Sequence, residues 1–152
     1  AIAPDLLEKI QNLCAEDPNF GLRLYKTKAG YRAAITHTSF EPGSYEANQL
    51  LERLGSDKLY VRLCERQSCF RARLTPKPWR IQMSSPPTRF PFKTPQHQQW
   101  FEEWVVNYEK ASKAYSVCTA IGEFGNTQIA DNVELVLQVH DLYCCGDSTK
   151  LA

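Results

Sequence analysis

The sequence predicts an α+β fold in which a small antiparallel sheet of three strands packs on helices and a C-terminal helical hairpin completes the core. Apolar residues recur at helical spacing in five segments, and they alternate at a period of two in three shorter ones. Two predicted helices separate the second strand from the third, which favours antiparallel pairing because the chain returns to the end it left. With 152 residues, 43% of them hydrophobic, the chain is expected to form one domain.

A helix and a strand pair are predicted first. Residues 4–15 carry an apolar stripe at helical spacing and begin with a proline, which suits a first helical turn. Alternating apolar and polar residues then predict strands over residues 20–27 and 31–38, with Gly30 in the turn between them. This pair should be a hairpin with one apolar face.

Two helices and the third strand are predicted next. Ser44 is the expected N-cap of a helix over residues 45–54, and Ser56 is the expected N-cap of a helix over residues 57–67. Residues 69–75 alternate again between apolar and charged side chains, which predicts a strand.

The C-terminal half begins with a proline-rich segment, residues 76–95, whose six prolines exclude most regular structure. Its bulky apolar side chains indicate a segment that wraps the domain in extended form. Tryptophans and tyrosines at steps of three and four residues predict a long helix over residues 97–121 with an aromatic core face, and a second helix runs from Ile129 to Leu142. Residues 146–152 are expected to be frayed.

The charge distribution gives the clearest functional signal. Residues 53–93 hold ten basic and only two acidic residues in a chain whose net charge is +1, and such asymmetry is typical of a surface that meets an anionic partner. If the apolar residues of the three strands face the core, their arginines share one outward face with Tyr25. The residues predicted to bind the partner are Arg23, Arg32, Arg62, Arg66, Arg71, Arg73, Lys77, Trp79 and Arg80.

From this surface we expect a non-enzymatic binding or assembly protein that docks an acidic protein partner. One alternative is an RNA-binding accessory factor, in which arginines pair with phosphates and aromatic rings stack on bases, although a near-neutral chain is a poor non-specific binder. Another is a small enzyme acting on an anionic substrate near His37, Arg71 and Lys77. Helices covering both faces of the sheet would instead bury or neutralise the arginines.

The segment around Lys77 is the most unusual one. Pro76 and Pro78 restrict the backbone on both sides of Lys77, which would hold this side chain out while Trp79 anchors the segment below. A rigidly presented cation suits recognition of a carboxylate or a phosphate. The alternative is a strand exit that is pinned by a buried tryptophan and has no binding role.

Two neighbouring segments, Leu59–Cys64 and Cys69–Arg80, have the sequences LYVRLC and CFRARLTPKPWR. They resemble a small family of uncharacterised proteins of bacteria and photosynthetic eukaryotes, and the likeness extends loosely to the hairpin and to the long tryptophan-bearing helix. The resemblance implies a small intracellular protein, bacterial or plastid, and it implies no activity, cofactor or catalytic residue.

Neither a cofactor nor a metal is expected. The six cysteines match no compact disulfide framework or zinc-knuckle spacing, and we interpret them as reduced thiols in a reducing compartment, cytoplasmic or organellar. His140 lies beside an apolar stripe and is predicted to be a core histidine. No phosphate-binding loop or nucleophile motif is present. No apolar run approaches the roughly 18–20 residues that span a bilayer, so no membrane partner is expected, and no signal peptide is visible.

Overall fold

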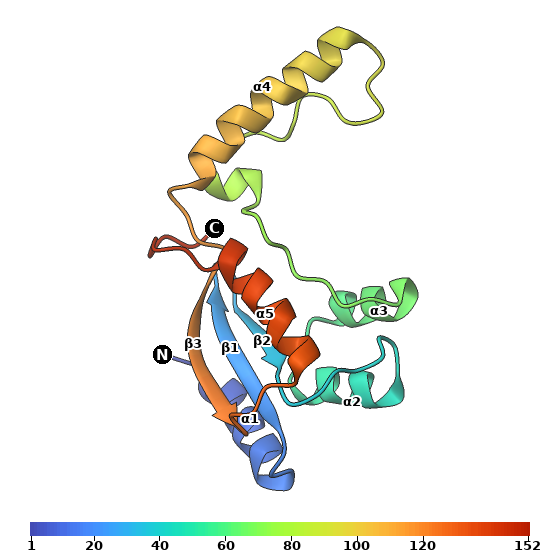
Figure 1. Cartoon of the computed structure of the whole chain (residues 1–152), viewed down its shortest axis with the longest axis vertical. Coiled ribbons are helices and arrows are strands. Elements are labelled where there is room, and N and C mark those ends of the chain that lie inside the picture. The colour runs from blue at the N-terminus through green and yellow to red at the C-terminus, as the bar shows by residue number, and fades with distance from the viewer. The chain divides into compact units, whose positions relative to one another are not determined.

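The computed structural model describes residues 1–152 and contains five α-helices, a short 3₁₀ helix and a three-stranded antiparallel sheet (Figure 1). The predicted α+β class is confirmed. The chain groups into two compact units, each assembled from separate stretches of sequence, and our assignment of the whole chain to one domain stays a prediction. The first unit comprises Ala1–Tyr25, Tyr31–Ala72 and Ala120–Val139, and the second comprises Lys26–Gly30, Arg73–Thr119 and His140–Ala152.

The sheet has its first strand at the centre, in the order β2-β1-β3. The strands are β1 (Gly21–Thr27), β2 (Tyr31–Ile35) and β3 (Cys118–Gly125). The first two form the predicted hairpin, whose turn is closed by a hydrogen bond of 2.9 Å from the Thr27 amide to the Gly30 carbonyl. At the end of β3, Gly125 has φ 74°, and a Cβ atom there would collide with the carbonyl oxygen of Phe20. Only glycine fits this close approach.

The third strand is not the one that the sequence predicted. Residues 69–75 form no regular structure, and the strand lies instead at residues 118–125, most of which we had assigned to the long helix and the break after it. Two glycines, Gly122 and Gly125, disfavour a helix in this segment. Pro76 and Pro78, which follow residues 69–75, have no backbone N–H, so a ladder could not continue regularly past Thr75.

The predicted helical hairpin is therefore interrupted in sequence. Both of its helices form, as α4 (Pro95–Ser112) and α5 (Asp131–Cys144), but β3 lies between them along the chain. The first helix is shorter than expected because it ends at Ser112 rather than continuing to residue 121.

In the first unit, α1 (Pro4–Glu16) packs on β1 through its apolar stripe, as predicted. The buried cluster that they form consists of Ile10, Leu13, Phe20, Leu22 and Leu24. Tyr25 is also completely buried, with 0% exposure. Because Leu24 and Tyr25 point to opposite sides of the strand, both faces of β1 are covered, and Tyr25 does not lie on an open face.

Of the two helices that follow, one begins at the N-cap residue that the sequence predicted and the other begins at a different one. The Ser44 hydroxyl accepts a hydrogen bond from the Ala47 amide at 3.2 Å and caps α2 (Tyr45–Arg53), as predicted. The helix α3 (Lys58–Gln67) is capped by Asp57 rather than Ser56, since the Asp57 carboxylate accepts from two amides, at 2.7 and 3.0 Å. A carboxylate at a helix N-terminus also interacts favourably with the helix dipole.

In the second unit, the proline-rich segment lies along α4. The Trp104 indole donates a hydrogen bond of 3.0 Å to the Ser84 carbonyl, and the Tyr108 hydroxyl donates one of 2.5 Å to the Pro76 carbonyl. The segment is irregular, as predicted, apart from the 3₁₀ helix η1 (Pro78–Ile81).

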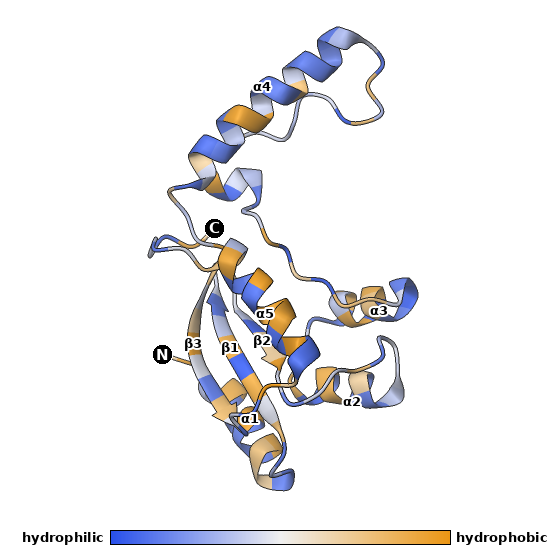
Figure 2. Ribbon diagram, in the orientation of Figure 1, coloured by the Kyte–Doolittle hydropathy of each residue, from blue (hydrophilic) through white to orange (hydrophobic).

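The aromatic row of α4 is not the buried core face that we predicted. No residue of α4 is fully buried, and Trp100 is exposed. Figure 2 shows this helix as hydrophilic (blue) along most of its length. The rings stack mainly on one another, with 4.9 Å between the ring centroids of Trp104 and Tyr108.

Residues 146–152 are held in place rather than frayed. The Ser116 amide donates to the Lys150 carbonyl at 2.9 Å, the Ala152 amide donates to the Ser116 carbonyl at 3.0 Å, and Ser116 and Leu151 form a parallel bridge. The partner of this tail lies about thirty residues earlier in the chain, so local sequence could not reveal the pairing. None of the helices combines the length and the apolar character needed to cross a membrane.

Candidate functional site

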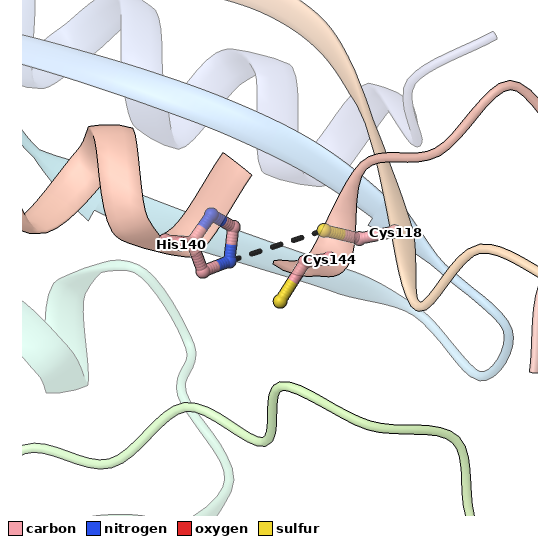
Figure 3. Close-up of side chains that lie close together, drawn as sticks. All are labelled: Cys118, His140 and Cys144. Atoms are coloured by element: carbon pink, nitrogen blue, oxygen red, sulfur yellow. Dashed lines mark hydrogen bonds between the residues drawn. The ribbon is translucent and has the colours of Figure 1, made fainter. Parts of the chain in front are cut away.

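A cluster of thiols and one imidazole forms where β3 begins and α5 ends, within the second unit. Figure 3 shows the side chains of Cys118, His140 and Cys144 turned toward one another. One potential ligand atom from each of the three lies within 4.8 Å of the other two, and the His140 Nε2 and Cys118 Sγ atoms are 3.9 Å apart. Cys118 and Cys144 have 0% exposure and His140 has 7%. These are buried groups that can bind a metal ion.

Local structure explains why these side chains meet. His140 and Cys144 are four residues apart on α5, so they lie on the same face of the helix. Cys118 is the first residue of β3, and the amide of the preceding Val117 donates a hydrogen bond of 2.9 Å to the Cys144 carbonyl. This backbone contact fixes the start of the strand against the last turn of the helix.

Asp141 sets the orientation of the imidazole. Its Oδ1 atom lies 2.8 Å from His140 Nδ1, and a neutral imidazole that donates its Nδ1 proton to this carboxylate keeps a lone pair on Nε2. Nε2 is the atom that faces the Cys118 sulfur. A carboxylate behind a histidine is the usual support for a metal-binding imidazole.

Cys145 lies at the edge of the same cluster. Its sulfur is 3.7 Å from the Cys118 sulfur and 3.9 Å from Asp141 Oδ1. Two sulfurs that both bind a tetrahedral zinc ion at about 2.3 Å are about 3.8 Å apart, so this spacing fits shared coordination. None of the six cysteines forms a disulfide bond.

A nucleophilic role for this Cys–His pair fits less well. A cysteine nucleophile needs a cavity that admits its substrate, whereas both members of the pair are buried. The cleft at the β1–β2 turn, with a volume of about 420 Å³, is lined by other residues. Thiols and an imidazole are groups that zinc accepts as ligands.

The predicted sheet face of arginines does not form. Arg23 is half-buried on β1 and its guanidinium pairs with the Glu123 carboxylate at 2.6 Å. Partial burial would lower the pKa of Arg23, but hydrogen bonds with Tyr25 and Glu123 raise it overall. Arg32 lies half-buried on β2. The expectation that the arginines stay on an open face is therefore wrong for the sheet, because both faces of β1 are covered.

Arg71 and Arg73 lie outside the sheet, because residues 69–75 are not a strand. The Arg71 Nε atom donates to the Cys69 sulfur at 3.3 Å. Arg73 donates to the carbonyls of Thr75 and Pro76, at 2.8 and 3.3 Å. Arg71 belongs to the first unit and Arg73 to the second.

Arg62 and Arg66 are exposed on α3, where Lys58 completes a row at spacings of four residues. No carboxylate of the chain lies within 4.0 Å of these three cations. This row is one part of the predicted basic surface that the structure leaves open to solvent.

The segment around Lys77 differs from prediction in one respect. Trp79 is 64% exposed rather than a buried anchor, because Pro78 and Ile81 are the buried residues of η1. The Lys77 ammonium lies 5.2 Å from the centroid of the Trp79 ring, a cation–π contact. Arg80 is half-buried in the same helix.

His37, the centre of the hypothetical enzyme site, has a structural environment. Its Nδ1 accepts a hydrogen bond of 3.1 Å from the Gly21 amide. The ring packs near Phe20 and Phe40, with centroid distances of 5.3 and 6.3 Å. These contacts give the imidazole a role in holding the end of β2.

The comparisons with known proteins add no assignment. No family model matches the chain, and no significantly similar protein was found among curated proteins or solved structures. The resemblance of residues 59–80 therefore stays an expectation, and the site has to be judged from its own geometry.

Sequence reasoning overlooked the His140–Cys144 pair, because the predicted helix ended at Leu142 and the structure extends it to Cys144, where a spacing of four residues can supply two ligands. Cys118 could not be added from the sequence. It is 22 residues from His140 and was assigned to a helix, so only the true position of β3 brings it to the pair.

Proposed function

We propose that this protein binds a zinc ion through Cys118, His140 and Cys144. The observation that carries the proposal is the placement of these three buried ligand atoms within 4.8 Å of one another. Zinc is favoured because it takes two thiolates and an imidazole readily, has no redox chemistry and accepts tetrahedral geometry. The metal would join the start of β3 to the end of α5.

The role of the ion is structural rather than catalytic. A catalytic zinc keeps an open position for water or substrate, whereas all three ligands here are buried. The Cys145 sulfur lies 3.7 Å from that of Cys118, but Cys145 is grouped with His140 and Asp141 and not with Cys144, so it would have to move to become a fourth ligand. A closed site of this kind contributes its binding free energy to folding.

The test is metal content and metal spectroscopy of the full chain. The protein purified with a thiol reductant should hold about one zinc per chain, and Co²⁺ in its place should give the intense visible bands of tetrahedral thiolate coordination. His140→Ala and Cys144→Ser should abolish both signals. Cys69→Ser, at a half-buried cysteine outside the cluster, is the matched control and should change neither.

An alternative chemistry of the same atoms would refute the proposal. If the protein, without reductant, contains a Cys118–Cys145 disulfide and no zinc, and the reduced protein still fails to take up Zn²⁺ or Co²⁺, the cluster is a thiol pair and not a metal centre.

The row Lys58, Arg62 and Arg66 supports a second candidate function, docking of an acidic partner. The apolar side chains of Leu59 and Leu63 on the same helix are also exposed, so α3 offers cations and apolar surface together. An acidic amphipathic peptide complements both features. RNA is the other anionic candidate for this row, but the sheet platform on which base stacking was predicted is not formed.

A pull-down and a salt titration distinguish binding of an acidic protein from binding of RNA. Reversing charge in Arg62→Glu/Arg66→Glu should abolish capture of an acidic protein, while Arg89→Glu/Lys93→Glu, with the same change in net charge, should retain it. RNA binding would instead weaken steeply as salt is raised. Equal loss in both double variants would contradict a role for α3.

A further inference from the structure

An open cleft separate from the metal cluster lies between the β1–β2 turn and the C-terminal tail, within the second unit. Its volume is about 420 Å³, which lies within the range of small-molecule sites. The turn contributes Lys26, Thr27 and Lys28, and the tail contributes Thr149 and Lys150. The cleft thus has two walls that are distant in sequence.

The charged side chains that line the cleft are all lysines. Three lysines line it and no acidic residue does. No carboxylate lies within 4.0 Å of the ammonium groups of Lys28 and Lys150. Like charges around one concavity repel each other and create a positive potential that favours an anionic ligand.

Hydrogen bonds hold both walls in position. In the turn, the Gly30 amide donates to the Thr27 hydroxyl oxygen at 3.2 Å and the Thr27 amide donates to the Gly30 carbonyl at 2.9 Å. In the tail, the Lys150 amide donates to the Ser148 hydroxyl oxygen at 3.1 Å, and its carbonyl accepts from Ser116. The cations are therefore mounted on ordered backbone, which reduces the entropy lost when a ligand binds.

The cleft also has an apolar part. Tyr115 and Leu151 complete its lining, and an aromatic ring can contact a planar organic group. Ammonium groups and threonine hydroxyls donate hydrogen bonds to phosphate oxygens, and charged hydrogen bonds are the strong ones. A ligand with a phosphate at one end and an organic group at the other satisfies both parts.

We propose that this cleft binds a small organic phosphate of nucleotide size, with Lys28 and Lys150 on the phosphate groups and Tyr115 against the organic part. None of the residues that line it is a ligand of the proposed zinc ion, so the two sites share no side chain.

The test is an NMR titration of the ¹⁵N-labelled, metal-loaded full chain with ADP, inorganic phosphate, adenosine and citrate as probes. ADP should saturate and shift the amides of Thr27, Gly30 and Thr149. Phosphate should bind more weakly at the same amides, and adenosine should bind weakly or not at all. If citrate binds as tightly as ADP, the cleft selects charge alone and the proposed organic phosphate is wrong.

Two double variants with the same charge change decide the residue assignment. Lys28→Ala/Lys150→Ala should weaken ADP binding at least tenfold, since each lysine supplies a charged hydrogen bond. Lys93→Ala/Lys110→Ala, at exposed lysines outside the cleft, should leave it unchanged. Equal weakening in both variants, shifts that map elsewhere, or no saturation at about 10 mM ADP would overturn the proposal. A folded amide spectrum confirms that each variant is intact.

Discussion

Replacing Asp141 with asparagine tests whether the imidazole of His140 is oriented for a metal ion. The Asp141→Asn side chain keeps its size but loses the carboxylate that lies 2.8 Å from His140 Nδ1. Loss of such a supporting carboxylate typically lowers metal affinity by about 10–100-fold, which is about 1.4–2.7 kcal/mol. The Asp141 side chain is 33% exposed, so solvent screening places the expected loss near the lower end, about tenfold.

The assay is competition for Zn²⁺ between the protein and a chromogenic chelator. His140→Ala sets the scale for loss of a ligand, and Asp147→Asn, at an exposed carboxylate beyond α5, should leave the affinity unchanged. An Asp141→Asn variant with wild-type affinity would show that the carboxylate does not support a ligand. If Asp141→Asn falls as far as His140→Ala, Asp141 would itself have to be a ligand, and the assignment of Nε2 would be wrong.

Three further predictions concern the first unit. Burial and the neighbouring Cys64 raise the pKa of Tyr60 to about 12. The stabilisation from its neutral phenol should therefore be present below pH 10 and lost as the pH rises toward 12. A spectrophotometric alkaline titration should show one tyrosine that ionises late, and Tyr60→Phe should remove that signal. Asp57→Ala should lower the free energy of unfolding by about 0.5–2 kcal/mol because it removes the α3 cap, whereas Ser56→Ala should change it little in the same urea titration. Leu24→Ala, at a residue with 0% exposure, should cost about 2–5 kcal/mol, and a loss below 1 kcal/mol would contradict the described core.

Helices and strands whose ends are marked by nearby capping or turn residues were predictable from sequence. The stripe of α1 and the hairpin turn at Gly30 depend on residues close together in the chain, and so does the Ser44 cap. These features appear where they were expected. Short-range patterns therefore determined most of the first half of the molecule.

Features that depend on distant contacts were not predictable in the same way. Residues 69–75 alternate whereas residues 118–125 do not, since Ala120 and Ile121 are adjacent, and it is pairing with β1 that makes the second segment a strand. That pairing also places Cys118 beside His140, so the error in the strand concealed the candidate metal site. Tyr25 was predicted to lie on a solvent-exposed face of β1, and this was wrong because burial of that face also depends on residues distant in the sequence.

Ser116 connects the two proposed binding sites. Its hydroxyl donates to the Ser148 carbonyl at 2.9 Å and accepts from the Gly146 amide at 3.2 Å, and its backbone bonds to Lys150 and Ala152. In the sequence, Ser116 lies between Tyr115, which lines the proposed phosphate cleft, and Cys118 of the proposed zinc site. The hydrogen bonds of Ser116 therefore help to position residues of both sites. Occupancy of either pocket should then tighten the other by an equal factor, because such linkage is reciprocal, and Ser116→Ala should uncouple them. Zinc titrations with and without ADP would measure that cross-talk directly.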